Sequence, residues 1–162
     1  MTEEQVKLWK RIETFELDED ESALTFTDRL ASENGWKYEF TARVIEEYKK
    51  FIFLICISKN SLTPSDAVDQ VWHLHLIYTY SYWKDLCARI LEREIHHGPT
   101  KGGSNESLKY KNLYSETLKF YKATFDQDPP SDIWPDPLIR FEDSRFQRVD
   151  LNKYWIIKKP SL

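Results

Sequence analysis

The sequence predicts an all-α fold, an irregular bundle of about six helices with an extended C-terminal tail, in a single domain over residues 1–162. Two observations favour this fold. Apolar side chains recur at the three- and four-residue spacing of amphipathic helices, and residues that start or stop helices lie between these stretches. The chain is also long enough for one hydrophobic core, and its 41% hydrophobic residues exclude a disordered chain.

The first two predicted helices come before residue 36. Thr2 can cap the first helix, because its hydroxyl can accept from a free backbone N–H of the first turn. The second helix is predicted over residues 22–33, with Leu24 and Leu30 as its anchors in the core. Gly35 follows Asn34, and we expect it to stop this helix because glycine readily adopts the left-handed conformation of helix ends.

The third predicted helix, residues 36–58, is expected to be the longest. Its last part, FIFLICI, is apolar on every side and could by composition form a buried strand. The continuity of this run with the helical stripe before it favours a helix that is buried all round. Glu46 and Lys50 lie four residues apart and are predicted to form an ion pair on its surface.

Two helices are predicted next. Thr63 as N-cap with Pro64 at the first helical position predicts a helix over residues 64–78. Another is expected to begin at Thr79 or Ser81 and to reach Leu91 or beyond, and Gly98-Pro99 is where a helix should end.

The last predicted helix spans residues 106–125, and Pro129-Pro130 closes it off. From residue 132 onward the apolar pattern weakens. The Trp-Ile-Ile run at 155–157 is expected to be a short strand or an extended segment docked on the helices.

Composition narrows the function classes. The net charge is −4 and the only basic grouping is a modest arginine cluster in residues 140–148, so nucleic acid is not an expected partner. Cys56 and Cys87 are too few for a disulfide scaffold, and the N-terminus lacks the apolar stretch of a signal peptide. The longest apolar run, residues 51–57, is far short of the roughly 20 residues of a membrane span. These features predict a cytoplasmic protein that does not enter membranes.

All four histidines lie between residues 68 and 99, as the pairs His73/His75 and His96/His97. On a regular helix, side chains two residues apart point about 200° away from each other. The first pair therefore cannot point into one site from a regular helix.

Asp69 and His73 are four residues apart, hence on one face of the predicted helix and one turn apart. The simplest metal site combines these two residues with His97 or His96, and His75 would be a fourth ligand or a residue that supports a ligand. Two imidazole nitrogens and one carboxylate with open positions suit a divalent transition metal, either zinc or ferrous iron. A water on such a metal could serve hydrolysis or oxygen chemistry.

Structural explanations compete with the metal site. A helical histidine beside a tryptophan is often hydrogen-bonded in the core, and a His-His pair before Gly-Pro can cap a helix. The spacing of the four histidines matches none of the well-defined zinc signatures. Cys87 could be a nucleophile beside a histidine, although its apolar neighbours favour a buried structural thiol.

Residues 64–135 resemble the glycine-rich domain-containing protein-like family. The resemblance is carried by Pro64-Ser65, VDQVWHLH, Thr79-x-x-Tyr82, Cys87, His96-His97-Gly98-Pro99 and YKATFDQDPPSDIWP. Two features depart from the pattern: Asp126 stands where glycine is expected, and the long glycine-rich tail is absent. We therefore expect a stand-alone version of the globular module.

The resemblance implies an intracellular helical domain but supplies no reaction. The shared residues that it implies are Asp69, Trp72, His73, His75, Tyr82, Cys87, His96 and His97. A core alone would not require so many polar groups, which strengthens the metal hypothesis. Two functions are therefore carried forward: a metal-binding domain that is a hydrolase or oxygenase, and a non-catalytic module that binds an unidentified protein partner and whose histidines are structural.

Overall fold

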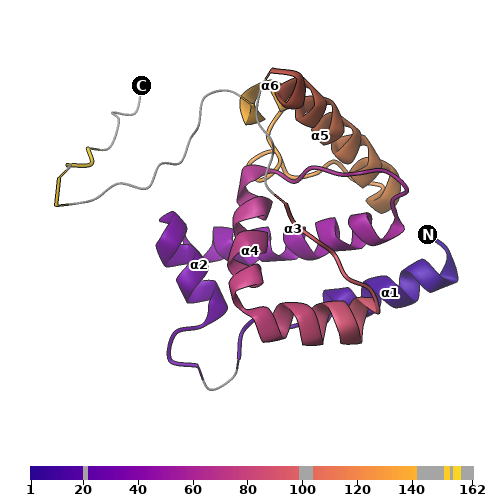
Figure 1. The fold of residues 1–162 in the computed structure, drawn as a ribbon, viewed down its shortest axis with the longest axis horizontal. Helices are drawn as coiled ribbons and strands as arrows, with labels where there is room; N and C mark the ends of the chain where they lie inside the picture. The colour runs from indigo at the N-terminus through magenta and orange to yellow at the C-terminus, as the bar shows by residue number, and fades with distance from the viewer. Residues whose placement is uncertain (20–21, 99–103, 142–151, 154, 158–162) are drawn as a thin grey trace.

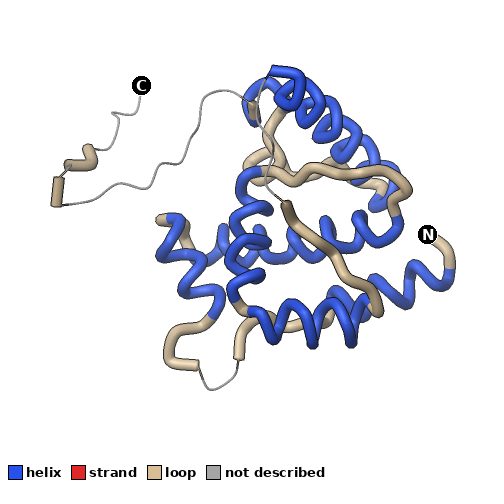
Figure 2. Tube along the Cα trace, viewed as in Figure 1, coloured by secondary structure: helices blue, strands red, loops and turns tan. Residues whose placement is uncertain are grey.

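The computed structural model describes the chain except for residues 20–21, 99–103, 142–151, 154 and 158–162. The described part contains seven helices and no strand, which confirms the predicted all-α class (Figures 1 and 2). The helices are α1 (Glu3–Glu13), α2 (Phe26–Asn34), α3 (Tyr38–Ile57), α4 (Asp66–Ile77), η1 (Ser81–Leu91), α5 (Ser104–Phe125) and α6 (Pro137–Arg140).

Helix α3 is the centre of the fold and contacts α1, α2, α4 and α5 (Figure 1). Val44, Phe51, Phe53 and Leu54 have no exposed surface. The apolar run at the end of α3 is thus helical, as predicted, because it packs against neighbours on several sides. The prediction that this helix is the longest is wrong, since α3 has 20 residues and α5 has 22.

The starts of α2 and α4 differ from the predictions. Helix α2 begins after Thr25, whose hydroxyl accepts from the Asp28 N–H, and this later start leaves Leu24 half-exposed rather than in the core. Helix α4 is capped by Ser65 and not by Thr63. The backbone N–H of Thr63 donates instead to the Thr117 hydroxyl of α5, at 3.0 Å.

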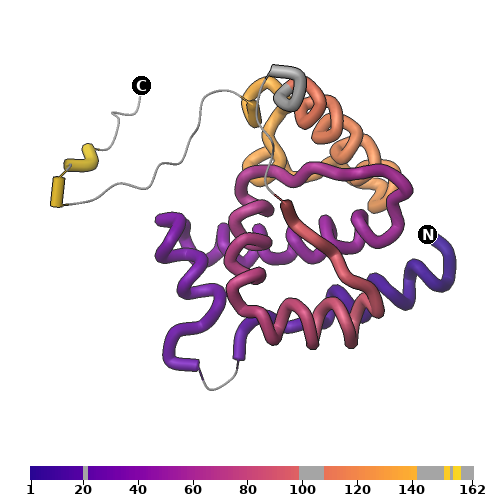
Figure 3. Tube along the Cα trace, viewed as in Figure 1, coloured from indigo at the N-terminus to yellow at the C-terminus, as the bar shows by residue number. Residues whose placement is uncertain are grey.

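Helices α2 and η1 each end at a single left-handed residue. Gly35 ends α2 with a φ of 65°, as predicted. The helix after residue 79 is a π-helix, η1, and it ends when Glu92 adopts a φ of 55°. The residues that follow, up to Gly98, are not helical, so the expectation of a helix that ends at Gly98-Pro99 is wrong. In Figure 3 this segment runs from the end of η1 back toward the loop that enters α4.

The Trp-Ile-Ile run of the tail is exposed and does not pack on the helices, contrary to the prediction. Trp155, Ile156 and Ile157 form no strand and are 93, 70 and 83% exposed. Arg145 and Arg148 of the arginine cluster lie outside the described residues, and Arg140 is paired with Asp66. No helix within the described ranges has both the length and the apolar character to cross a membrane.

Candidate metal centre

Asp69, His73 and His97 converge, although 24 residues separate the two histidines in the sequence. The Nε2 atoms of the histidines are 2.8 Å apart. The Asp69 carboxylate places Oδ1 3.2 Å from Nε2 of His97 and Oδ2 3.7 Å from Nε2 of His73. Each residue offers one potential ligand atom, and these three atoms all lie within 4.8 Å of one another. The three residues therefore form a candidate metal-binding group.

Two elements bring this group together. Helix α4 supplies Asp69 and His73 on one face, as their four-residue spacing predicts. The segment after η1 supplies His97, whose ring stacks on the indole of Trp72 with centroids 4.3 Å apart and planes 16° apart. Because α4 also carries Trp72, one helix turn both provides ligands and holds the third ligand in place.

A buried hydrogen-bond relay fixes the segment that carries His97. The indole N–H of Trp72 donates to the Tyr82 hydroxyl at 2.9 Å, and this hydroxyl donates to the carbonyl of Ile95 at 2.6 Å. Tyr82 has no exposed surface, and Trp72 and Ile95 are 5% exposed. Since buried hydrogen bonds in a dry environment are costly to break, Tyr82 is positioned to hold His97 without touching it.

The short distance between the two Nε2 atoms limits what can lie between them. If both atoms presented lone pairs they would repel, so either one nitrogen carries a proton or a cation lies between them. Two nitrogens bound to one zinc ion at about 2.0–2.1 Å would lie roughly 2.9–3.4 Å apart, close to the separation found here. The donor set thus suits a divalent metal after only small shifts.

The group lies at the surface but is not fully exposed. The side chains of Asp69 and His97 are 21 and 19% exposed, and that of His73 is 51% exposed. Three protein ligands leave one or more positions on a metal open to solvent, which is the arrangement of catalytic rather than purely structural zinc sites.

His75 points elsewhere, as helical geometry predicts. It has no exposed surface; its Nδ1 is 2.9 Å from the Tyr48 hydroxyl and its Nε2 is 3.1 Å from the Ser81 hydroxyl. Burial lowers the pKa of His75 to about 3, so the imidazole stays neutral. Both of its nitrogens are occupied, and the structure does not bring it to the Asp69 group.

His96 also lies apart from the group. Its Nε2 is 3.3 Å from a carboxylate oxygen of Glu94, and the two side chains are 74 and 72% exposed. The structure therefore brings together three of the five predicted ligands, and of the two distal histidines it selects His97.

Neither cysteine is an activated nucleophile, although only Cys87 is fully buried. Cys87 is 1% exposed, and burial is the main reason that its pKa is raised. Burial likewise raises the pKa of Cys56 to about 11. Since the thiolate is the nucleophile, both residues are poorly suited to covalent chemistry at neutral pH.

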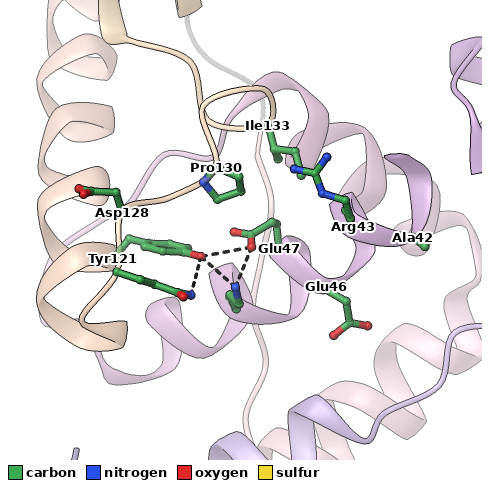
Figure 4. A pocket seen from close by; sticks show the side chains of 10 residues that line it. Ala42, Arg43, Glu46, Glu47, Tyr121, Asp128, Pro130 and Ile133 are labelled. Atoms are coloured by element: carbon green, nitrogen blue, oxygen red, sulfur yellow. Dashed lines mark hydrogen bonds and ion pairs between the residues drawn. The ribbon is translucent and has the colours of Figure 1, made fainter. Parts of the chain in front are cut away.

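A second polar cluster, which the sequence reasoning missed, surrounds Glu47 of α3 (Figure 4). Glu47 is 5% exposed and accepts from Lys50 Nζ at 2.8 Å, from the Tyr121 hydroxyl at 3.2 Å and from the Trp134 indole at 2.8 Å. The predicted Glu46–Lys50 pair is wrong, because α3 pairs residues three apart: Lys50 with Glu47, and Lys49 with Glu46. The sequence gives little sign of this burial, because the glutamates and lysines of α3 are spaced like ion pairs on an exposed helix surface.

This Glu47 cluster borders a pocket of about 490 Å³. Burial disfavours the Lys50 ammonium, but its hydrogen bonds to Glu47 and Tyr121 outweigh that effect, so the pKa of Lys50 is raised and it stays charged. The charges of Glu47 and Lys50 compensate each other. The cluster therefore joins α3 to α5 and to the loop that contains Trp134, and it is best explained as part of the scaffold.

Comparisons with protein-family models, with curated proteins and with solved structures found no match to this chain.

Proposed function

We propose that this protein binds one divalent transition metal ion, zinc or ferrous iron, through Asp69, His73 and His97. The convergence of one carboxylate and two imidazole Nε2 atoms from separate parts of the chain carries the proposal. Both metals accept two histidines and one carboxylate, and the remaining positions take water or substrate.

A bound metal would make the site catalytic in one of two ways. It lowers the pKa of a coordinated water and so supplies hydroxide for hydrolysis, or, as ferrous iron, it offers open positions for oxygen. The partial exposure of all three ligands gives a small molecule access to such positions. We therefore infer a metal-dependent hydrolase or oxygenase.

The same proposal includes membership of the glycine-rich domain-containing protein-like family and a cytoplasmic location. The residues that carry the resemblance include the three proposed ligands together with Trp72 and Tyr82, which hold His97 in place. Two free cysteines without a disulfide fit a reducing, cytoplasmic setting.

Metal content and metal affinity test the proposal. Protein purified without an affinity tag should contain close to one equivalent of zinc or iron, or take up one equivalent of zinc after treatment with a chelator. Asp69→Asn should weaken zinc binding by more than about 100-fold, because it removes an anionic ligand. Asp85→Asn is the matched control: Asp85 is a carboxylate of η1 paired with Arg89, and its loss should leave zinc affinity unchanged.

The proposal fails if the folded protein binds no zinc or iron, or if Asp69→Asn and Asp85→Asn bind zinc equally. Assays of the metal-loaded protein with ester, phosphoester and amide substrates, and of oxygen uptake with ferrous iron, then separate a hydrolase from an oxygenase.

One observation favours the alternative, a protein-interaction module. His73 and His97 are already within hydrogen-bond distance, so a proton alone could join α4 to the segment that follows η1. This alternative predicts a reproducible protein partner whose binding is indifferent to chelators and to Asp69→Asn.

A further inference from the structure

A small pocket lies beside the proposed metal group, on the other side of His97. It has a volume of about 220 Å³, and its walls include residues 61–64, residues 96–98, and Lys109, Tyr110 and Leu113 of α5. His97 and Trp72 line it, whereas Asp69 and His73 do not. His97 is therefore shared between the metal group and this pocket.

The pocket offers apolar surface for the body of a ligand. Leu62, Pro64, Trp72, Tyr110 and Leu113 contribute to its walls. Pockets for small organic molecules are typically lined in this way, with a few polar groups that fix the orientation of the ligand.

The charge of the lining favours an anion. Among the described lining residues Lys109 is the one permanently charged side chain, and it is cationic; none of the described lining residues is an aspartate or a glutamate. The chain as a whole carries 27 acidic against 23 basic residues, so the described part of the lining, which has no carboxylate, differs from the average composition of this protein.

Two polar groups of residues that line the pocket have no hydrogen-bond partner within the described part of the chain. The contacts of His97 with His73 and Asp69 both use Nε2, and no described residue is hydrogen-bonded to its Nδ1. A metal-bound histidine usually donates its second N–H to a carboxylate, a carbonyl or a water. The Thr63 hydroxyl is also buried without a partner, although Thr63 lines the same pocket.

We propose that this pocket binds a small monocarboxylate with an apolar body, whose carboxylate accepts from Nδ1–H of His97 and lies near Lys109. The role of His97 rests on the proposed function, because metal binding at Nε2 leaves the proton on Nδ1. The ligand's carboxylate then accepts the hydrogen bond that the second N–H of a metal-bound histidine usually donates. Metal and carboxylate therefore bind cooperatively, and by linkage each raises the affinity for the other by the same factor.

Benzoate is the probe, and benzamide, which has the same shape but no charge, is its control. Both are titrated into the full-length protein, with and without one equivalent of zinc, and binding is followed by amide chemical shifts. We expect benzoate to bind the zinc-loaded protein at least about tenfold more tightly than benzamide, since hydrogen bonds to a charged acceptor are the stronger ones. Zinc should raise the affinity for benzoate.

Two variants separate the pocket from other binding modes. Leu113→Trp fills the pocket and should abolish benzoate binding while zinc affinity is retained, and Lys109→Gln, at an exposed position, should weaken benzoate several-fold without affecting folding. Benzoate that binds the zinc ion directly would bind both variants normally, and that result overturns the proposal. So does equal binding of benzoate and benzamide.

Failure of the metal proposal has a different signature. In that case zinc does not bind at all, and benzoate still binds to the zinc-free protein in a manner sensitive to Leu113→Trp. Absence of benzoate binding from a protein that does bind zinc overturns the pocket and leaves the metal centre standing.

Discussion

His73 and His75 are separated by one residue on the same helix, yet their surroundings are opposite. The His73 side chain is half-exposed and its Nε2 faces His97 and Asp69. His75 has no exposed surface, and both of its ring nitrogens are within hydrogen-bond distance of hydroxyl groups. The two imidazoles have the same chemistry in isolation, so only their positions around α4 separate them.

The difference shows what makes a histidine available as a ligand. The aromatic rings of Phe15, Phe26, Tyr48 and Tyr82 surround His75, and burial keeps its imidazole neutral. Such a histidine stabilises the core and has no free nitrogen for a metal. His73 contributes little packing, but its nitrogen faces two other potential ligands. The variants below should therefore separate stability from metal affinity.

Replacement of His75 should have the largest effect on stability. His75→Ala leaves a cavity in the core and removes the partner of the buried Tyr48 hydroxyl, so we expect the free energy of unfolding to fall by about 3–5 kcal/mol. His73→Ala, at a half-exposed position, should cost less than about 1 kcal/mol in the presence of a chelator. Urea unfolding measures both, and equal losses would remove the distinction.

The second effect is on the pH dependence of stability. The pKa of His75 is about 3 in the folded protein and about 6.5 in the unfolded chain, so between these values the unfolded chain binds a proton that the folded protein does not. Stability is therefore complete above pH 6.5 and falls as the pH decreases. Between pH 6.5 and 4.5 the loss from this residue should be about 2 kcal/mol.

The pH effect requires a control because carboxylates also titrate in this range. His75→Gln keeps a donor and an acceptor but cannot take up the proton, and its stability should fall by about 2 kcal/mol less over the same interval. His73→Gln should retain the slope of the unmodified protein. If His75→Gln keeps the full slope, His75 is protonated in the folded state.

Tyr82 should affect metal affinity without being a ligand. Tyr82→Phe leaves the Trp72 indole and the Ile95 carbonyl unpaired and loosens the segment that carries His97. We expect zinc affinity to fall by roughly 10–100-fold, the range found for residues that orient metal ligands.

A matched variant distinguishes positioning from a general loss of stability. Tyr114 is equally buried and its hydroxyl donates to the carbonyl of Pro135 at 2.8 Å, away from the metal group. Tyr114→Phe should lower stability to a similar extent but leave zinc affinity unchanged. Equal loss of zinc affinity in the two variants would mean that Tyr82 has no specific role.

The local part of the site could be predicted from the sequence, and the long-range part could not. Helical periodicity places Asp69 beside His73 and turns His75 away, because both relations depend only on the rotation per residue. The choice between His96 and His97 depends on the course of the chain after the left-handed Glu92 and on the bond from Tyr82 to Ile95. Neither feature has a local sequence signal.

The same limit applies to the fold. The helices were predictable because apolar spacing and capping residues are local. The cap of α4 is nevertheless Ser65 rather than Thr63, whose backbone N–H donates to Thr117 of α5. The burial of Glu47 depends on Tyr121 and Trp134, which are more than 70 residues away. A sequence pattern gives the face of a helix, but not the partner of that face.

The second histidine pair offers the smallest expected effect and the strictest test of the comparison. His96 and His97 are adjacent, but His97 is stacked on Trp72 and faces Asp69, whereas His96 is paired with Glu94 in solvent. His96→Ala should change zinc affinity by less than about twofold, while His97→Ala should lower it by more than about 100-fold. Isothermal titration of zinc into both variants measures the ratio. If His96→Ala weakens zinc binding as strongly as His97→Ala does, the segment after η1 adopts another course when metal binds, and the rigid positioning of His97 by Trp72 and Tyr82 is wrong.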